Sequence, residues 1–266
     1  MTTSYLDRGE GRIAYEVAGE GPLVVCVPGM GDLRSAFRFT VPALLGAGYR
    51  VAAMDLRGHG ESDDGFTAYD DPALASDIRA LVAHLGGPAL LIGNSMGAAS
   101  SIIAAAEQPE LVAGLALMGP WVRDPKPNPV MRLVQRVMLV KPWGPAAWRA
   151  FYKTLYPGRR PDDLASHVDR IGAAMRRGDH WRSFARTTTT SHAPVEARLD
   201  DVRAPALVVM GEKDPDFPDP AAEARFAAER LHGELLMVPD SGHYPQADSP
   251  DVVNPAVLTF AAKVFG

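Results

Sequence analysis

A serine flanked by small residues carries the strongest chemical signal in this chain. Ser95 lies in the segment G-N-S-M-G at 93–97, between the apolar run Ala89–Ile92 and the small-residue stretch Ala98–Glu107. These flanking patterns predict a strand and a helix, so Ser95 falls on a sharp strand-to-helix turn. Such a turn exposes the hydroxyl, and the glycines on either side leave room for its tight backbone. We therefore predict that Ser95 is a nucleophile.

A serine hydroxyl is a weak nucleophile and needs a base that accepts its proton. His243 fits this role best, because it follows the last predicted strand, Leu235–Val238, in the glycine-containing loop D-S-G-H at 240–243. His59, in R-G-H-G at 57–60, is the main competitor, and we interpret its segment as a structural turn near the site. Surface or core positions are the simpler explanation for the remaining histidines, which are His84, His167, His180, His192 and His232.

The imidazole in turn needs a carboxylate that fixes its tautomer. The predicted strand Leu207–Met210 leads into G-E-K-D-P-D at 211–216, so Asp214 and Asp216 are both within reach. We favour Asp214 because it lies nearer to the strand end. We expect Asp216 to cap a turn or the following proline-rich segment. The chain order is then serine, acid and histidine.

A nucleophilic attack on a carbonyl also requires N–H donors for the oxyanion that forms. Met96 directly follows the predicted nucleophile and begins a helix, whose N-terminus adds partial positive charge. Met30 is the second candidate donor, in the loop P-G-M-G-D at 28–32 after the predicted strand Leu23–Val27. We expect Gly29 and Gly31 to let the backbone of this loop approach the substrate closely.

The elements that position these residues alternate between strands and helices. Short apolar runs predict strands at Arg12–Val17, Leu23–Val27, Arg50–Met54, Ala89–Ile92, Leu115–Met118, Leu207–Met210 and Leu235–Val238, the first of them in an N-terminal hairpin. Their continuous hydrophobicity is typical of strands covered on both faces of a parallel sheet. Helical patterns lie between them at Pro72–Leu85, Ala98–Glu107 and Pro220–Leu231. The alternation predicts an α/β doubly wound sheet.

The segment 121–199 breaks this alternation. It predicts short helices punctuated by prolines, at Val130–Val140, Ala146–Tyr156, Asp162–Arg177 and His180–Thr188. We predict that it is a helical cap inserted after the sixth strand, over a core made of residues 1–120 and 200–266. The alternative is an ordinary helical layer whose aromatic side chains are all core. In the cap interpretation, aromatic residues of this segment bind the substrate, namely Trp121, Trp143, Trp148 and Phe151.

Composition limits the partners and cofactors. The net charge of −5 over 266 residues gives no sign of a nucleic-acid or anionic-membrane partner, because both require a basic surface. The lone Cys26 cannot form an internal disulfide. The sequence has neither a signal-peptide pattern nor an apolar run near the roughly 20 residues that cross a bilayer. We expect a cytoplasmic monomer or homodimer with a small-molecule substrate, no metal and no other cofactor, because no metal-ligand spacing occurs.

Taken together, these motifs resemble the α/β-hydrolase superfamily. They occur in its order over essentially the whole chain, as P-G-M-G at 28–31, D-L-R-G-H-G-E-S at 55–62, G-N-S-M-G at 93–97, G-E-K-D at 211–214 and S-G-H at 241–243. The resemblance is closest to bacterial small esterases, lactonases, cofactor-free haloperoxidase-like enzymes and ring-cleavage C–C hydrolases. It implies a mostly parallel central sheet flanked by helices, with Ser95, Asp214 and His243 as a catalytic triad. One departure is Pro28, where many relatives have histidine.

The resemblance favours hydrolysis of a carboxylic ester or lactone of a small hydrophobic substrate. Serine at position 95 argues against epoxide hydrolases and haloalkane dehalogenases, which use an aspartate nucleophile. A C–C bond hydrolase remains an alternative that uses the same triad. It would need a cation for a substrate carboxylate, and Arg34, Arg123 and Arg186 are the candidates. A ligand-binding protein on a hydrolase scaffold is the alternative that is not an enzyme.

Overall fold

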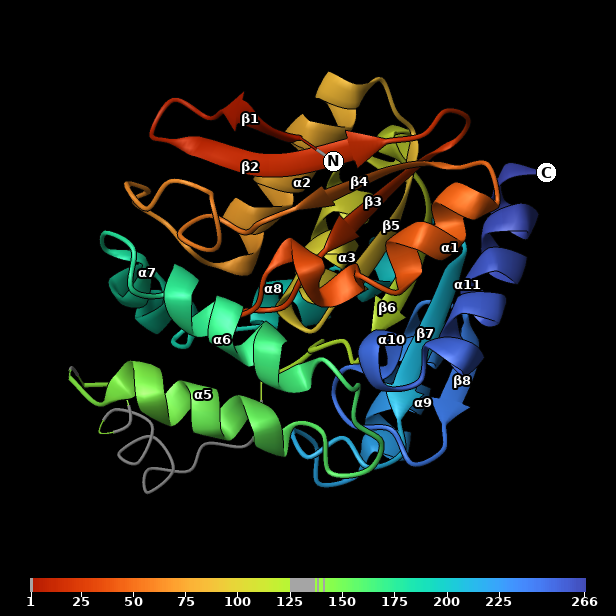
Figure 1. The fold of residues 1–266 in the computed structure, drawn as a ribbon. Helices are drawn as coiled ribbons and strands as arrows, with labels where there is room; N and C mark the ends of the chain where they lie inside the picture. The colour runs from red at the N-terminus through yellow and green to blue at the C-terminus, as the bar shows by residue number, and fades with distance from the viewer. Residues whose placement is uncertain (1, 125–136, 138, 141) are drawn as a thin grey trace.

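The computed structural model describes residues 2–124, 137, 139–140 and 142–266. At its centre is an eight-stranded sheet with the strand order β1-β2-β4-β3-β5-β6-β7-β8 (Figure 1). The strands are β1 (Thr3–Asp7), β2 (Arg12–Ala18), β3 (Leu23–Val27), β4 (Arg50–Met54), β5 (Ala89–Asn94), β6 (Val112–Met118), β7 (Ala206–Gly211) and β8 (Glu234–Val238). β2 pairs antiparallel with β1 and β4, and the other pairs are parallel. The expected mostly parallel sheet is confirmed.

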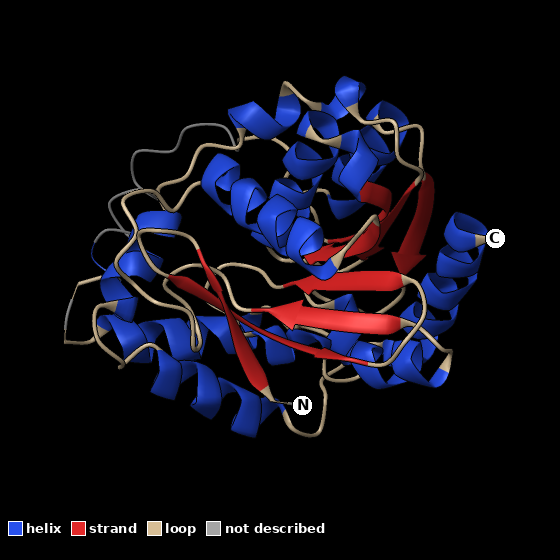
Figure 2. Ribbon diagram, turned by 90° about the horizontal axis from the view of Figure 1, so that it is seen from above, coloured by secondary structure: helices blue, strands red, loops and turns tan. Residues whose placement is uncertain are grey.

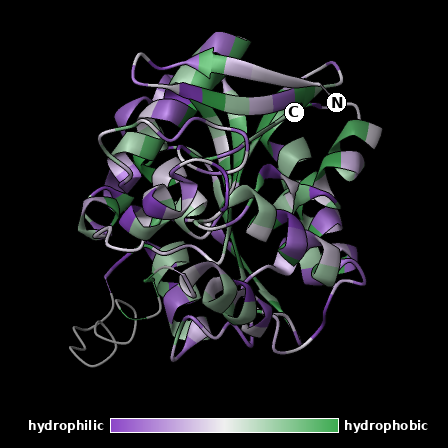
Figure 3. Ribbon diagram, turned by 60° about the vertical axis from the view of Figure 1, so that its left-hand side comes forward, coloured by the Kyte–Doolittle hydropathy of each residue, from purple (hydrophilic) through white to green (hydrophobic). Residues whose placement is uncertain are grey.

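Two apolar cores lie on opposite faces of this sheet, because side chains alternate along each strand. In β3, Val25 belongs to one core and Cys26 to the other. The first core is covered by α2 (Asp71–Leu85), α3 (Met96–Glu107) and α9 (Pro220–Arg230), and the second by α1 (Thr40–Gly46) and α11 (Pro250–Phe265). Figure 2 shows the sheet between helices, and Figure 3 shows that the strands in the middle of the sheet are hydrophobic (green).

Helices between β6 and β7 form a third apolar cluster. They are α5 (Gly144–Thr154), α6 (Leu164–Ala174) and α7 (His180–Thr187). The short helix α8 (Ala193–Glu196), also in this segment, instead buries Val195 in the first core. Tyr152 and Trp181 from these helices pack with Tyr244, which follows β8, and with the partly buried Met30, which follows β3. The cluster therefore covers loops at the carboxyl ends of the parallel strands. The division of the chain into a core and a cap at 121–199 stays a prediction.

Shorter elements complete the described part of the chain. They are η1 (Arg34–Phe37), η2 (Pro109–Leu111), η3 (Leu199–Asp201) and α10 (Pro245–Asp248). The helix expected at Val130–Val140 falls mostly outside the described residues. None of the helices in the described ranges is long and apolar enough to cross a bilayer.

Candidate active site

Ser95 occupies a strained turn between β5 and α3. Its backbone has φ 52 and ψ −120, a region that residues other than glycine rarely adopt. The Ser95 N–H donates to the carbonyl of Met118 at 2.9 Å, which ties the turn to β6. A Cβ added to Gly93 would lie 2.5 Å from Ala98 Cα, and one on Gly97 would meet backbone carbonyls at the end of β3. The turn thus has the tight geometry that the glycine spacing predicts.

His243 and Asp214 form a buried pair. The Nδ1 atom of His243 lies 2.7 Å from Asp214 Oδ2, and the two side chains are 2% and 0% exposed. The other oxygen, Asp214 Oδ1, accepts the N–H of Asp216 at 3.0 Å. A Cβ added to Gly119 would come within 3.2 Å of both Oδ2 and Nδ1, so glycine at this position leaves room for the pair. Of the two candidate carboxylates, Asp214 is the one beside Nδ1.

Asn94 connects the turn of Ser95 to the loop of His243. Its amide Nδ2 donates to the His243 carbonyl at 3.1 Å and to the Met118 carbonyl at 3.0 Å. The Ser95 hydroxyl itself forms no hydrogen bond with another described residue, an arrangement common in enzymes without bound substrate. Asn94 is not among the site residues predicted from the sequence. Its signal is a polar residue at the end of an otherwise apolar strand.

Asp216 approaches the opposite side of the same imidazole. Its Oδ2 atom lies 3.5 Å from His243 Nε2, and its side chain is 21% exposed. The expectation that Asp216 caps a turn or the next segment is therefore wrong. The residue that caps α9 is Asp219, whose Oδ1 accepts the N–H of Ala222 at 2.9 Å. Asp216 instead places a second carboxylate beside the candidate base.

The two carboxylates change the protonation of the imidazole. Burial alone would lower the pKa of His243, but the charge of Asp214, followed by that of Asp216, outweighs burial and raises this pKa to about 9. Burial also raises the pKa of Asp216, against the opposing effect of the nearby His243. The site is therefore arranged to stabilise an imidazolium, the species that forms when His243 accepts a proton.

The expected oxyanion donors lie on the two loops that flank Ser95. Met96 is the first residue of α3, so its N–H has no acceptor within the helix. Met30 follows β3, and its side chain packs between the first and third apolar clusters. A Cβ added to Gly29 would lie 3.0 Å from Ser95 Cβ, which shows how closely this loop approaches the serine.

Gly31 is required by its backbone conformation and by the side chain that packs on it. Its φ is 71, and a Cβ there would meet the indole of Trp148. The Trp148 Nε1 atom donates to the Gly31 carbonyl at 3.1 Å. Glycine at this position therefore serves a left-handed backbone and close packing against α5, and its approach to the substrate stays a prediction.

The four aromatic residues expected to bind substrate have different surroundings. Trp121 packs on Phe217 with ring centroids 5.2 Å apart, and Phe217 lies 6.4 Å from the ring of His243. Trp148 packs on the loop after β3, where it donates to the Gly31 carbonyl. Trp143 and Phe151, in contrast, are 51% and 37% exposed. The structure thus brings Trp121 and Trp148 to the site and leaves the other two largely at the surface.

The competing histidine, His59, is buried in a turn. Its Nδ1–H donates to the Arg57 carbonyl at 2.9 Å, and burial lowers its pKa to about 4, so the ring is neutral. It lines a small cavity with Asp32 and Phe184, and no hydrogen bond or ion pair joins it to Asp214 or Ser95 in the described residues. This arrangement agrees with the structural turn expected from the sequence.

One group of residues has the proximity of metal ligands. In the described part of the chain, the donor atoms of Asp214, Asp216 and His243 lie within 4.8 Å of one another. These are the residues of the site itself, and Asp214 and His243 already pair with each other. The expectation that the protein needs no metal stays a prediction.

Comparisons with known proteins place this site in a family. The family model "Alpha/beta hydrolase family" matches residues 24–256. The chain is 32% identical to the dihydrolipoyllysine-residue acetyltransferase component of an acetoin cleaving system from Pseudomonas putida, over 94% of this chain and 66% of that longer protein. It is 27% identical to a 2-hydroxy-6-oxononadienedioate/2-hydroxy-6-oxononatrienedioate hydrolase from a Pseudomonas species, over 98% and 97% of the two chains.

The fold is shared with a solved esterase structure from Exiguobacterium antarcticum. The TM-score is 0.85 at 21% sequence identity, and the match covers 98% of this chain and all of the other (100%). At this identity the likeness concerns the fold.

Proposed function

Because this chain belongs to the alpha/beta hydrolase family, we propose that it is a serine hydrolase that cleaves a carboxylic ester or lactone of a small hydrophobic substrate. The observation that carries the proposal is the hydrogen bond between Asp214 and His243 Nδ1, with Ser95 on a strained turn that Asn94 ties to the histidine loop. A buried carboxylate on Nδ1 leaves Nε2 to exchange protons with the substrate.

The proposed mechanism is acyl transfer through Ser95. His243 accepts the serine proton as the hydroxyl oxygen attacks the substrate carbonyl, and the N–H groups of Met30 and Met96 stabilise the oxyanion. His243 then gives its proton to the departing alcohol, which leaves an acyl-enzyme. Water, activated by His243, attacks the acyl carbon and releases the carboxylic acid. Asp214 holds the imidazole tautomer throughout.

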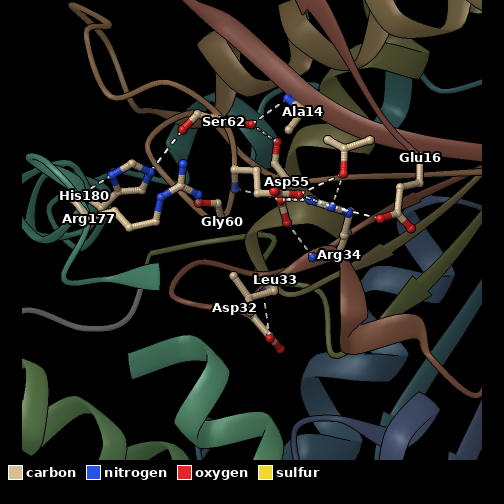
Figure 4. Close-up of polar contacts among 12 residues, drawn as sticks. Ala14, Glu16, Asp32, Leu33, Arg34, Asp55, Gly60, Ser62, Arg177 and His180 are labelled. Carbon is tan, nitrogen blue, oxygen red and sulfur yellow. Dashed lines mark hydrogen bonds and ion pairs between the residues drawn. The ribbon is translucent and has the colours of Figure 1, made fainter. Parts of the chain in front are cut away.

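The ion pairs of Arg34 argue against the C–C hydrolase alternative. That reaction needs a cation that is free to bind a substrate carboxylate. Arg34 is surrounded by acidic side chains (Figure 4). It pairs with Asp55 and Glu61 and lies 2.9 Å from Glu16. These contacts join the N-terminal hairpin to the loops after β3 and β4, so the guanidinium serves the fold.

The other two candidate arginines are also occupied. Arg123 forms a bidentate pair with Glu223, at 3.0 and 2.7 Å. Arg186 donates to backbone carbonyls of Phe66 and Thr67, and its guanidinium lies 4.8 Å from the centre of the Tyr69 ring. None of the arginines proposed for a substrate carboxylate is therefore available, which favours an ester or lactone substrate.

The proposal is tested with a fluorophosphonate probe and a panel of chromogenic esters, lactones and vinylogous 1,5-diketones. A serine hydrolase of this kind is labelled at Ser95 and shows a burst of alcohol release followed by slower turnover. A ligand-binding protein on the same scaffold binds panel members without releasing product. A C–C hydrolase cleaves the diketones in preference to the esters.

A further inference from the structure

The carboxylate of Asp216 has no role in the mechanism described so far. Asp214 already occupies Nδ1 of His243, and Asp216 lies 3.5 Å from Nε2 on the other side of the ring. Nε2 is the nitrogen that delivers the proton to the departing alcohol. A group that receives this proton must therefore come close to the carboxylate of Asp216.

The position of Asp216 is fixed by the loop that also holds Asp214. Its N–H donates to Asp214 Oδ1 at 3.0 Å, and the preceding Pro215 restricts the backbone. The next residue, Phe217, packs between Trp121 and the ring of His243. The side chain of Asp216 is 21% exposed while that of Asp214 is 0% exposed. Asp214 is thus hidden from a ligand, whereas part of the Asp216 side chain is exposed.

Asp216 also lacks a permanent counter-charge. Among the residues that the structure describes, no lysine or arginine forms an ion pair with it, and His243 is its one ion-pair partner. During catalysis His243 is neutral before it accepts the Ser95 proton and after it gives that proton up, so at both stages the carboxylate has no positively charged partner. A poorly solvated carboxylate attracts a cation and repels an anion. The site therefore discriminates among substrates by charge.

We propose that Asp216 is a specificity residue that selects esters whose alcohol portion carries a positive charge and rejects esters with a carboxylate there. This inference rests on the proposed function and names the substrate class for it. The departing alcohol takes its proton from Nε2 as its bond to the acyl carbon breaks, and a cationic group on it then lies near Asp216. The acyl portion remains hydrophobic.

Three thioesters with one acyl group test this proposal, with a thiol portion of matched size in the place of the alcohol portion. They are the butanoyl thioesters of 2-(trimethylammonio)ethanethiol, its uncharged isostere 3,3-dimethylbutanethiol, and 3-sulfanylpropanoate, with thiol release followed by a chromogenic thiol reagent. The proteins are the wild type, Asp216→Asn and Asp219→Asn. Asp219 is exposed in the same loop, and asparagine also caps helices, so Asp219→Asn removes an equal charge without changing the site.

The wild type is expected to favour the cationic thioester over its isostere by about tenfold in kcat/KM, and the isostere over the anionic thioester. Asp216→Asn brings both ratios close to those of the uncatalysed hydrolysis of the same thioesters, and Asp219→Asn preserves the wild-type ratios. In Asp216→Asn the rising limb of the pH profile for the uncharged thioester also moves to lower pH, which a purely structural residue would not cause. If the wild type has nearly the same kcat/KM for the cationic thioester and its uncharged isostere, the inference is overturned. It is also overturned if Asp216→Asn prefers the cationic thioester as strongly as the wild type does.

The results that would overturn the proposed function differ from those that would overturn only the role of Asp216. If the fluorophosphonate does not label Ser95 and none of the three thioesters is cleaved, both the function and the inference are overturned. If Ser95 is labelled and the uncharged thioester is cleaved without charge preference, the function stands and the role of Asp216 is rejected.

Discussion

The side-chain amide of Asn94 donates a hydrogen bond to the backbone carbonyl of His243 at 3.1 Å, across 149 positions of sequence. Asn94 precedes Ser95, the proposed nucleophile, so this bond fixes the serine turn relative to the histidine loop. The reaction rate depends strongly on the placement of the reacting groups. A displacement of about 1 Å can lower the rate on the order of 100-fold.

We expect Asn94→Ala to lower kcat by about 10-fold to 100-fold while the KM for a small activated ester changes little. Asn254→Ala is the matched control, since Asn254 Nδ2 donates to the Phe39 carbonyl at 3.0 Å away from the site. Steady-state kinetics and thermal melts separate the effect on catalysis from the effect on stability. Equal losses of kcat in both variants would show that Asn94 does not position the site.

The two carboxylates beside His243 should differ strongly in their contribution. Asp214→Asn removes the acceptor of Nδ1–H and permits the wrong tautomer, so kcat is expected to fall by roughly 10⁴. Asp216→Asn should cost far less with an uncharged ester, because Asp216 does not contact Nδ1. The measurement is kcat for each variant with that ester. The reverse ranking would move the acid of the triad to Asp216.

The pH dependence should reflect the raised pKa of His243. The imidazole must be neutral to accept the serine proton, so kcat/KM rises as the pH passes this pKa. Because Asp214 and Asp216 raise it to about 9, the rising limb should lie above the ordinary histidine value of 6.5. Asp216→Asn removes one of the two charges and should move the limb to lower pH. A wild-type midpoint at or below 6.5 would contradict this electrostatic account.

Trp148 should influence substrate preference more than Trp143. Trp148 packs on the oxyanion loop through Gly31, whereas Trp143 is 51% exposed. For the wild type, each added acyl methylene should increase kcat/KM about fourfold, from about 0.8 kcal/mol of buried apolar surface, until the pocket is full. Trp148→Ala should change this chain-length profile, and Trp143→Ala should leave it close to the wild type. Identical profiles in all three proteins would reject a role for Trp148 in specificity.

The parts of the fold that depend on local pattern could be predicted from the sequence. The strands β3 and β4 have the bounds predicted for them, because apolar runs closed by turn residues carry the signal. The pairing of Asp214 with His243 also has the predicted partners, since parallel strands bring the loops at their carboxyl ends together.

The roles that depend on long-range packing could not be predicted in this way. The side chain of Asp216 was expected in a turn, because only the folded loop shows that it lies beside Nε2. The packing of Gly31 against the indole of Trp148 could not be predicted either, because Trp148 is distant in sequence. The position of Asn94 at the end of an apolar strand does not reveal its role, because its partner lies on another loop.

The most direct test of the proposed function is labelling with a fluorophosphonate probe, followed by mass spectrometry to identify the modified residue. Ser95 lies on the strained turn next to the Asp214–His243 pair, so we expect a single modification at Ser95. Ser95→Ala should abolish both the modification and ester hydrolysis, with a loss of about 10⁴ to 10⁶ in kcat and an unchanged thermal melt. Labelling of a different serine, or full ester hydrolysis by Ser95→Ala, would contradict the assignment of Ser95 as the nucleophile.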